Sequence, residues 1–300
     1  MRTTASNVVV VSPPAKLHPT LELEEDNLRD CAFDDMAGTY DATFTDTKVG
    51  RALREIVWSR LEQIFRPSQR ILELGCGTGE DAVRLASNGV RVVATDPSSQ
   101  MIQMARRKAL IGNCQERIEF RCLAAEDIGS FADGDVFDGV LSNFGAVNCV
   151  RDLQALVADV AERLAPGAPL LWVVMGRHAP WEWLWYLMRG RWRKAWRRLR
   201  PGGIKWRGLT ISYPTPAQMR SLLLPHFAVT RLAPLGVALP PSYASAWLER
   251  SPFAAGVLTR LEKWAQRSTV LASWSDHFIV EAVRLPRGSA RVNAPAAGAA

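Results

Sequence analysis

The sequence predicts a doubly wound α/β domain, in which helices cover both faces of a mostly parallel sheet. Two observations support this prediction. Short apolar runs alternate with helical patterns from residue 70 to residue 175, and glycine, proline or polar residues bound each run. Strict alternation of strand and helix favours parallel strands, and right-handed crossovers bring the loops that leave those strands to one functional edge.

An amphipathic helix over residues 48–64 precedes the alternation, because its apolar positions recur at three- and four-residue steps until Pro67. The expected strands cover residues 70–74, 90–95, 118–123, 136–142 and 169–175. The expected helices between them cover residues 79–87, 98–110 and 152–164. We then expect a long insert, a helix over 216–224, a strand over 227–232, a second and mostly helical insert, and a final antiparallel strand over 277–285.

The expected organisation is a single domain over residues 28–285 between two flexible ends. Residues 1–27 mix serine, proline and acidic side chains, and residues 286–300 are rich in alanine, glycine and proline. Two inserts, at about 177–214 and 235–275, follow strands whose ends face the functional edge. We therefore expect them to form a helical cap over whatever binds there.

Composition excludes several classes of protein. The chain is 48% hydrophobic and 22% charged, as is usual for a globular protein. No stretch approaches the roughly 18 consecutive apolar residues that a membrane-spanning helix needs, and the apolar run at residues 8–11 is too short for a secretory signal. The five cysteines show no zinc-like spacing, so we expect a cytoplasmic protein without a metal site.

The most informative motif is Ile-Leu-Glu-Leu-Gly-Cys-Gly-Thr-Gly over residues 71–79, where a strand turns into a helix. Its three glycines let the backbone approach a ligand closely. A dinucleotide site would need its third glycine at position 80, where Glu80 stands, so the spacing favours a nucleoside without a pyrophosphate. Asp96, at the tip of the second strand, is suited to accept hydrogen bonds from both ribose hydroxyls.

These residues resemble the class I S-adenosylmethionine-dependent methyltransferases, in particular the branch with the ubiquinone and menaquinone C-methyltransferases. The resemblance runs from about residue 33 to residue 175 and includes Phe-Asp-Asp-Met-Ala-Gly-Thr-Tyr-Asp at residues 33–41, which is similar to the N-terminal segment of that branch. It implies a Rossmann-like fold, S-adenosyl-L-methionine as cofactor and methyl transfer as activity. The cofactor-binding residues that it implies are Tyr40, Glu73, Gly75, Cys76, Gly77, Gly79, Asp96, Pro97, Met101, Ala124, Ala125, Glu126 and Asn143.

The resemblance assigns these residues to parts of the cofactor. Tyr40 packs near the sulfonium, the glycine loop holds the methionine moiety, and Met101 and the Ala125 N–H contact the adenine. The family often has an aspartate at the position of Ala124, so Glu126 or Asp127 is the expected substitute here.

Methyl transfer from a sulfonium is an in-line displacement that needs a general base only where the acceptor loses a proton. His178 lies just past the fifth strand, and we expect it and Tyr40 to be catalytic, with Glu182 as a further candidate. Because the final strand should run antiparallel, we expect His277 to lie near the pocket.

The net charge of +7 is concentrated, since residues 177–207 contain ten basic side chains and a single acid, Glu182. Tryptophans recur there at helical steps while most arginines lie off that stripe, which predicts an amphipathic helix, or two helices broken at Gly190. Four interpretations stay open: the wall of an apolar acceptor pocket, a helix at a membrane interface, a nucleic-acid grip, or a lid whose tryptophans only pack on the domain. The substrate-pocket residues expected under the first are Phe144, Trp181, Trp185 and Tyr186.

The expected function is therefore methyl transfer to a small hydrophobic acceptor that is aromatic, quinone-like or isoprenoid. We expect an enzyme of small-molecule biosynthesis that does not bind nucleic acid. Two alternatives belong to other classes. One is a nucleic-acid methyltransferase that uses the arginine- and tryptophan-rich insert, and the other is a donor-binding partner protein that no longer catalyses a reaction.

Overall fold

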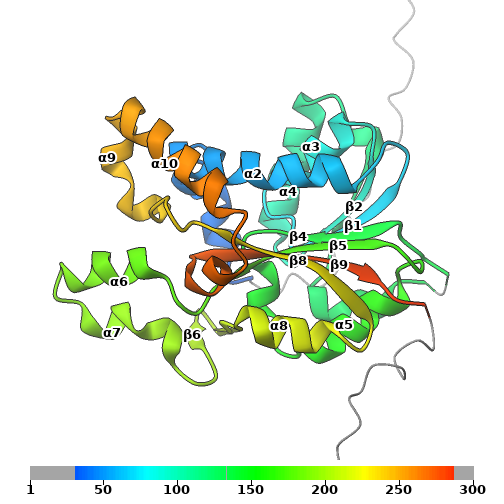
Figure 1. The fold of residues 1–300 in the computed structure, drawn as a ribbon. Helices are drawn as coiled ribbons and strands as arrows, with labels where there is room; N and C mark the ends of the chain where they lie inside the picture. The colour runs from blue at the N-terminus through cyan, green and yellow to red at the C-terminus, as the bar shows by residue number, and fades with distance from the viewer. Residues whose placement is uncertain (1–30, 133, 287–300) are drawn as a thin grey trace, which may run out of the picture.

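The computed structural model describes residues 31–132 and 134–286. The expected flexible segments, residues 1–27 and 286–300, lie outside the described residues apart from Pro286. A seven-stranded sheet with strand order β3-β2-β1-β4-β5-β9-β8 forms the centre of the molecule (Figure 1). Its strands are β1 (Arg70–Leu74), β2 (Arg91–Asp96), β3 (Ile118–Cys122), β4 (Gly139–Ser142), β5 (Pro169–Met175), β8 (Phe227–Leu235) and β9 (His277–Arg284).

The sheet is parallel from β3 to β5, and only β9 runs against its neighbours β5 and β8. The predicted doubly wound architecture with an antiparallel final strand is confirmed. Parallel strands bring the glycine loop after β1, Asp96 at the end of β2 and the loop after β4 to one edge. Because β9 is antiparallel, its first residue, His277, pairs with Met175 at the end of β5 and lies at that same edge.

Helices cover both faces of the sheet because successive strand residues point to opposite sides. Ile71 belongs to the core on one face and Leu72 to the core on the other. Figure 1 shows α2 (Lys48–Ile64), α3 (Glu80–Ser87) and α4 (Ser99–Ile111) over the first face, and α5 (Leu153–Glu162) and α8 (Pro216–Leu223) over the second.

Most element boundaries agree with the sequence pattern to within two residues, and two strands differ by three. β4 begins at Gly139 and not at residue 136, because Phe137 forms only an isolated bridge, with Leu164. β8 continues to Leu235 because β9 supplies a partner along its whole length.

The first insert is two helices, α6 (Pro180–Leu187) and α7 (Trp192–Ala195), and the break falls at Gly190, whose φ is +65°. A hairpin of β6 (Ile204–Trp206) and β7 (Leu209–Ile211) follows, which the sequence did not predict. The second insert contains α9 (Ala246–Glu249), α10 (Pro252–Ala265) and the 3-10 turn η8 (Val270–Trp274). Both inserts lie at the edge of the sheet seen at the left of Figure 1.

Within the described residues, no helix is long and apolar enough to cross a membrane. The same residues contain no group of three histidine, cysteine or acidic side chains that could hold a metal ion.

Candidate functional site

The three glycines of the loop after β1 have different tasks. All adopt left-handed angles, with φ of +69° at Gly75, +54° at Gly77 and +79° at Gly79. A Cβ atom at Gly75 would overlap the Ala146 side chain, and one at Gly79 would overlap Ala105. A Cβ atom at Gly77 would meet nothing within 4 Å. Two of the glycines are therefore required by packing, whereas Gly77 borders open space that a ligand can fill.

Asp96 faces that loop with a buried carboxylate. Its two oxygens accept hydrogen bonds from the Gly77 N–H and the Ser98 N–H, each at 2.9 Å. Burial raises the pKa of Asp96 to about 6, although these two N–H donors act to lower it. A carboxylate at this position, where β2 ends beside the glycine loop, can bind the hydroxyls of a ribose.

A buried network that the sequence did not reveal connects α2 with the loop after β4. Arg54 Nη1 donates to Asp81 Oδ2 at 2.9 Å, and Asn143 Nδ2 donates to the same oxygen at 2.8 Å. Asn143 Oδ1 accepts from the Phe144 N–H at 2.9 Å. Asn143 therefore fixes the loop through both ends of its amide, and its contact with the cofactor stays a prediction. Arg54 directly follows Leu53 in the apolar stripe of residues 48–64, and this position was the sequence signal that could have predicted its burial.

Two buried polar atoms near this network have no hydrogen-bond partner among the described residues: Glu73 Oε2 and Arg54 Nε. Burial raises the pKa of Glu73 well above its usual range, and Asp81 raises it further. One atom can accept a hydrogen bond and the other can donate one. The methionine end of S-adenosylmethionine carries an ammonium and a carboxylate, so this pair fits the two charged groups.

The N-terminal segment lies over the glycine loop and α4. Asp41 accepts from Thr78 Oγ1 at 2.7 Å and pairs with Lys108 Nζ at 3.0 Å. Burial raises the pKa of Tyr40, whose ring centroid lies 6.1 Å from that of Phe44. The segment that the sequence likened to a methyltransferase N-terminus therefore covers the expected donor site.

The remaining residues predicted to bind the cofactor occupy the ends of β2 and β3. Met101 is buried in the first turn of α4, and Ala124 and Ala125 begin the 3-10 turn after β3. Glu126 accepts from the Arg151 N–H at 2.9 Å, so one of its oxygens already has a partner. Burial raises the pKa of Cys76 well above its usual range, which is typical of a packing residue and not of a reactive thiolate.

The two candidate histidines have different surroundings. His178 stacks on Trp274 at 5.0 Å between ring centroids, and its Nδ1 lies 3.0 Å from the carbonyl oxygen of Ser273. The ring of His277 lies 5.7 Å from that of Phe144, in the loop that also holds Asn143. The structure thus places His277 beside the loop after β4 and His178 against η8, and the catalytic role predicted for His178 stays a prediction.

His277 is the end of a chain of charged groups. Its Nδ1 lies 2.8 Å from Asp276 Oδ2, and Arg198 Nη2 lies 2.7 Å from Asp276 Oδ1. Burial acts to raise the pKa of Asp276, but Arg198 and then His277 outweigh it, so the pKa falls below its usual range. Asp276 therefore stays an anion that can orient the imidazole.

A buried cluster of charged side chains anchors the first insert. Glu182 is fully buried and accepts from Arg197 at 2.8 Å, from Arg198 at 2.8 Å and from the Tyr243 hydroxyl at 3.2 Å. Arg198 is 5% exposed, whereas Trp192 is 65% exposed. Trp192 is therefore not packed on the domain, whereas Arg198 is buried because Glu182 and Asp276 neutralise its charge. Glu182, a candidate base in the sequence, is occupied as an ion-pair anchor.

The predicted substrate-pocket residues fall into two aromatic clusters. Phe144 contacts Phe44 at 4.8 Å between ring centroids, beside the glycine loop. Tyr186 and Trp185 pack instead on Tyr243 of the second insert, at 6.0 and 6.3 Å. Trp181 donates from Nε1 to the carbonyl oxygen of Val237 at 2.9 Å. The insert aromatics therefore join the two inserts to each other.

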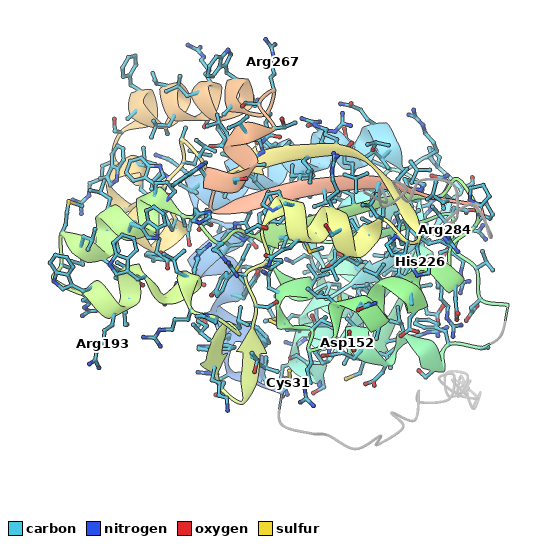
Figure 2. The ribbon with its side chains drawn as sticks, turned by 60° about the horizontal axis from the view of Figure 1, so that its bottom comes forward. Cys31, Asp152, Arg193, His226, Arg267 and Arg284 are labelled. Carbon is cyan, nitrogen blue, oxygen red and sulfur yellow. The ribbon has the colours of Figure 1, made fainter. Side chains whose placement is uncertain are left out.

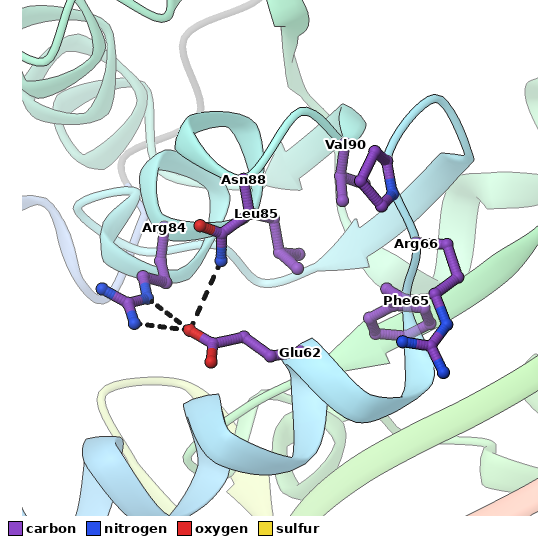
Figure 3. A pocket seen from close by; sticks show the side chains of 8 residues that line it. Glu62, Phe65, Arg66, Arg84, Leu85, Asn88 and Val90 are labelled. Carbon is purple, nitrogen blue, oxygen red and sulfur yellow. Dashed lines mark hydrogen bonds and ion pairs between the residues drawn. The ribbon is translucent and has the colours of Figure 1, made fainter.

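Two surface hollows are lined by none of the residues predicted to bind the cofactor. One of about 410 Å³ sits between the ends of α2 and α3, where Glu62 bonds Arg84 and Asn88 (Figure 3). It borders the amino ends of β1 and β2 and is therefore opposite the glycine loop. The other, of about 900 Å³, is lined by residues from the start of α5, the hairpin and α8, among them Arg177, Arg200 and Tyr213.

Comparison with known proteins agrees with this geometry. Residues 71–167 match the family model described as methyltransferase domain. The fold is that of the class I S-adenosylmethionine-dependent methyltransferases, and residues 71–167, which include the glycine loop and Asp96, form a methyltransferase domain that uses S-adenosylmethionine.

Individual relatives carry more specific names. The chain is 34% identical over 139 residues to a demethylmenaquinone methyltransferase of Clavibacter sepedonicus, covering 46% of this chain and 54% of that protein. It is 27% identical over 155 residues to the tRNA 5-carboxymethoxyuridine methyltransferase of Escherichia coli K12, covering 50% and 59%. It thus spans a little over half the length of these relatives. Among solved structures, the [4+2]-cyclase SpnF superposes with a TM-score of 0.57 at 14% identity, covering 85% of this chain and 94% of that one.

Proposed function

We propose that this protein transfers the methyl group of S-adenosylmethionine to a small hydrophobic acceptor that is aromatic, quinone-like or isoprenoid. The donor cradle carries the proposal, because Gly77 leaves open space beside the buried Asp96 carboxylate. The demethylmenaquinone methyltransferases among the relatives support an acceptor of this class. Because a [4+2]-cyclase has a similar fold, the fold alone does not identify the reaction. The proposal therefore depends on the residues of the donor site.

S-adenosylmethionine supplies a methyl group on a sulfonium, which an acceptor atom takes up by in-line displacement. The task of the protein is to hold the two reactants close together and to exclude water. Asp96 accepts hydrogen bonds from the ribose, while Glu73 and Arg54 bind the charged methionine end. The aromatic rings of Tyr40 and Phe144 form an apolar wall on the acceptor side.

For an acceptor that loses a proton, we add His277 to the predicted bases His178 and Tyr40. His277 Nδ1 lies 2.8 Å from Asp276 Oδ2, and an imidazole beside a carboxylate is suited to take a proton. We expect His277→Asn to lower kcat about 100-fold with a hydroxyl acceptor and to leave the Kd for the donor unchanged. His178→Asn is the matched control. A full loss in that variant with normal turnover in His277→Asn would assign the base to His178.

The proposed function is tested with donor labelled in the transferable methyl group, incubated with purified protein and a lysate of the source cells. Enzyme-dependent label in the organic phase supports a hydrophobic acceptor, and Asp96→Ala should abolish it. Label that enters RNA would overturn the acceptor class. Absence of any labelled product, while the protein binds the donor, would favour the non-catalytic partner role.

Besides the similarity to a tRNA methyltransferase, one structural observation favours the nucleic-acid alternative. Arg191, Arg193 and Lys194 of the first insert are exposed, and Figure 2 shows Arg193 pointing away from the body of the molecule. A true nucleic-acid groove loses affinity steeply with salt, so RNA binding measured across a salt series separates this alternative from weak surface attraction. Contact of the same insert with a membrane stays a prediction.

A further inference from the structure

The second insert carries an exposed apolar row on α10 that the sequence analysis did not single out. Phe253, Val257, Leu261 and Trp264 follow one another at three- and four-residue steps and so share one side of the helix. They are 84%, 38%, 49% and 67% exposed. Single exposed apolar side chains are common, but a continuous row with two aromatic rings is typical of a contact surface.

The opposite side of α10 is fixed to the body of the protein. Glu262 is fully buried and accepts hydrogen bonds from the N–H groups of Gly236 at 2.8 Å, Ala238 at 2.7 Å and Leu239 at 3.2 Å. Glu249, just before α10, accepts from the Lys48 N–H at 2.8 Å. These bonds prevent α10 from rotating its apolar row inward, so the row stays outside.

Unpaired positive charge surrounds the row. Arg250, Arg260, Lys263 and Arg267 are exposed, and within the described residues none of them has an ion-pair partner. The only acids between residues 242 and 272 are Glu249 and Glu262, which are both engaged. Figure 2 shows Arg267 pointing away from the end of α10. The surface thus combines apolar side chains with basic side chains that have no acidic partner in the part of the chain that the structure describes.

We propose that α10 docks this protein onto an anionic membrane surface. The apolar row enters the boundary between headgroups and acyl chains, and the four bases meet anionic headgroups. A second copy of the chain is a poorer occupant, because a symmetric contact would bring two sets of unpaired bases together. The docking goes beyond the proposed methyl transfer and does not depend on it.

The test is flotation of the full chain with two kinds of vesicle, phosphatidylcholine alone and an equal mixture with phosphatidylglycerol. We expect binding to the mixed vesicles that weakens with salt, and little binding to phosphatidylcholine. Phe253→Ser with Trp264→Ser should lower the partition coefficient at least about tenfold, since two aromatic side chains no longer leave water. Arg260→Gln, Lys263→Gln and Arg267→Gln together should remove the preference for the anionic lipid.

The matched control is Leu110→Ser with Ile111→Ser, a pair that is 65% and 86% exposed at the end of α4. This variant should bind vesicles as the unaltered protein does, and thermal unfolding shows that each variant is folded. Equal binding to both vesicles, or unchanged binding by the Phe253 and Trp264 variant, would overturn the proposal. A stable dimer in light scattering that this variant converts to monomer would assign the face to a second copy instead.

Discussion

Gly77 separates ligand binding from packing within the glycine loop. Alanine at this position adds a methyl group in open space next to Asp96 and costs about 1–2 kcal/mol of stability, because φ is positive. We expect Gly77→Ala to weaken donor binding at least tenfold in calorimetry. Gly167→Ala is the control, since its φ of +84° and open surroundings impose the same strain far from the site. Equal donor affinity in the two variants would contradict the assignment.

Asp96 makes donor binding depend on pH. Its pKa of about 6 in the free protein means that protonation removes an acceptor as pH falls. Because the ribose hydroxyls bind the ionised carboxylate, we expect donor affinity to be full above pH 7 and to fall as pH drops through about 6. Titrations of the donor from pH 5 to pH 8 measure this. Asp96→Asn should bind weakly and without this dependence; a pH profile shared by both proteins would assign the titration to another group.

At the scale of elements, the first insert depends on one buried carboxylate. Glu182→Ala leaves Arg198 buried with Asp276 as its remaining anion and removes the partner of Tyr243. We expect a loss of roughly 3–5 kcal/mol in the free energy of unfolding, measured by chemical denaturation, and faster proteolysis between residues 177 and 214.

The control for this anchor is Asp35→Asn, which removes an ion pair with Arg207 in which the Asp35 side chain is 85% exposed. An exposed pair contributes less than about 1 kcal/mol. If both substitutions had the same small effect, the insert would be held by its aromatic contacts and not by Glu182.

At the scale of the whole molecule, the N-terminal segment and both inserts meet the same edge of the sheet. A donor bound beneath them stabilises the folded state, and S-adenosylhomocysteine at a hundred times its Kd should raise the free energy of unfolding by about 2.7 kcal/mol. Thermal unfolding with and without this ligand measures the shift. Gly77→Ala, with binding at least tenfold weaker, should show at most about 1.4 kcal/mol at the same ligand concentration, and an equal shift in that variant would place the binding elsewhere.

Local patterns carried most of the architecture and the donor half of the site. Strand and helix alternation needs only neighbouring residues, and the glycine loop and Asp96 lie in the 27 residues from 70 to 96. The hairpin of β6 and β7 escaped prediction because each strand has three residues, too few for a period to emerge. The tryptophan spacing predicted the two helices of the first insert, but it could not show that Glu182 pairs with Arg198, which is 16 residues further along the chain.

The sequence by itself determined the parallel sheet, the cofactor loop and the position of the inserts, since each follows from periodicity and spacing along the chain. Only the tertiary structure decided which distant groups meet: Asp81 with Arg54 and Asn143, Arg198 with Asp276, and Glu262 with the N–H groups that follow β8. These contacts join residues tens of positions apart, and they depend on how whole elements pack, which no local pattern encodes.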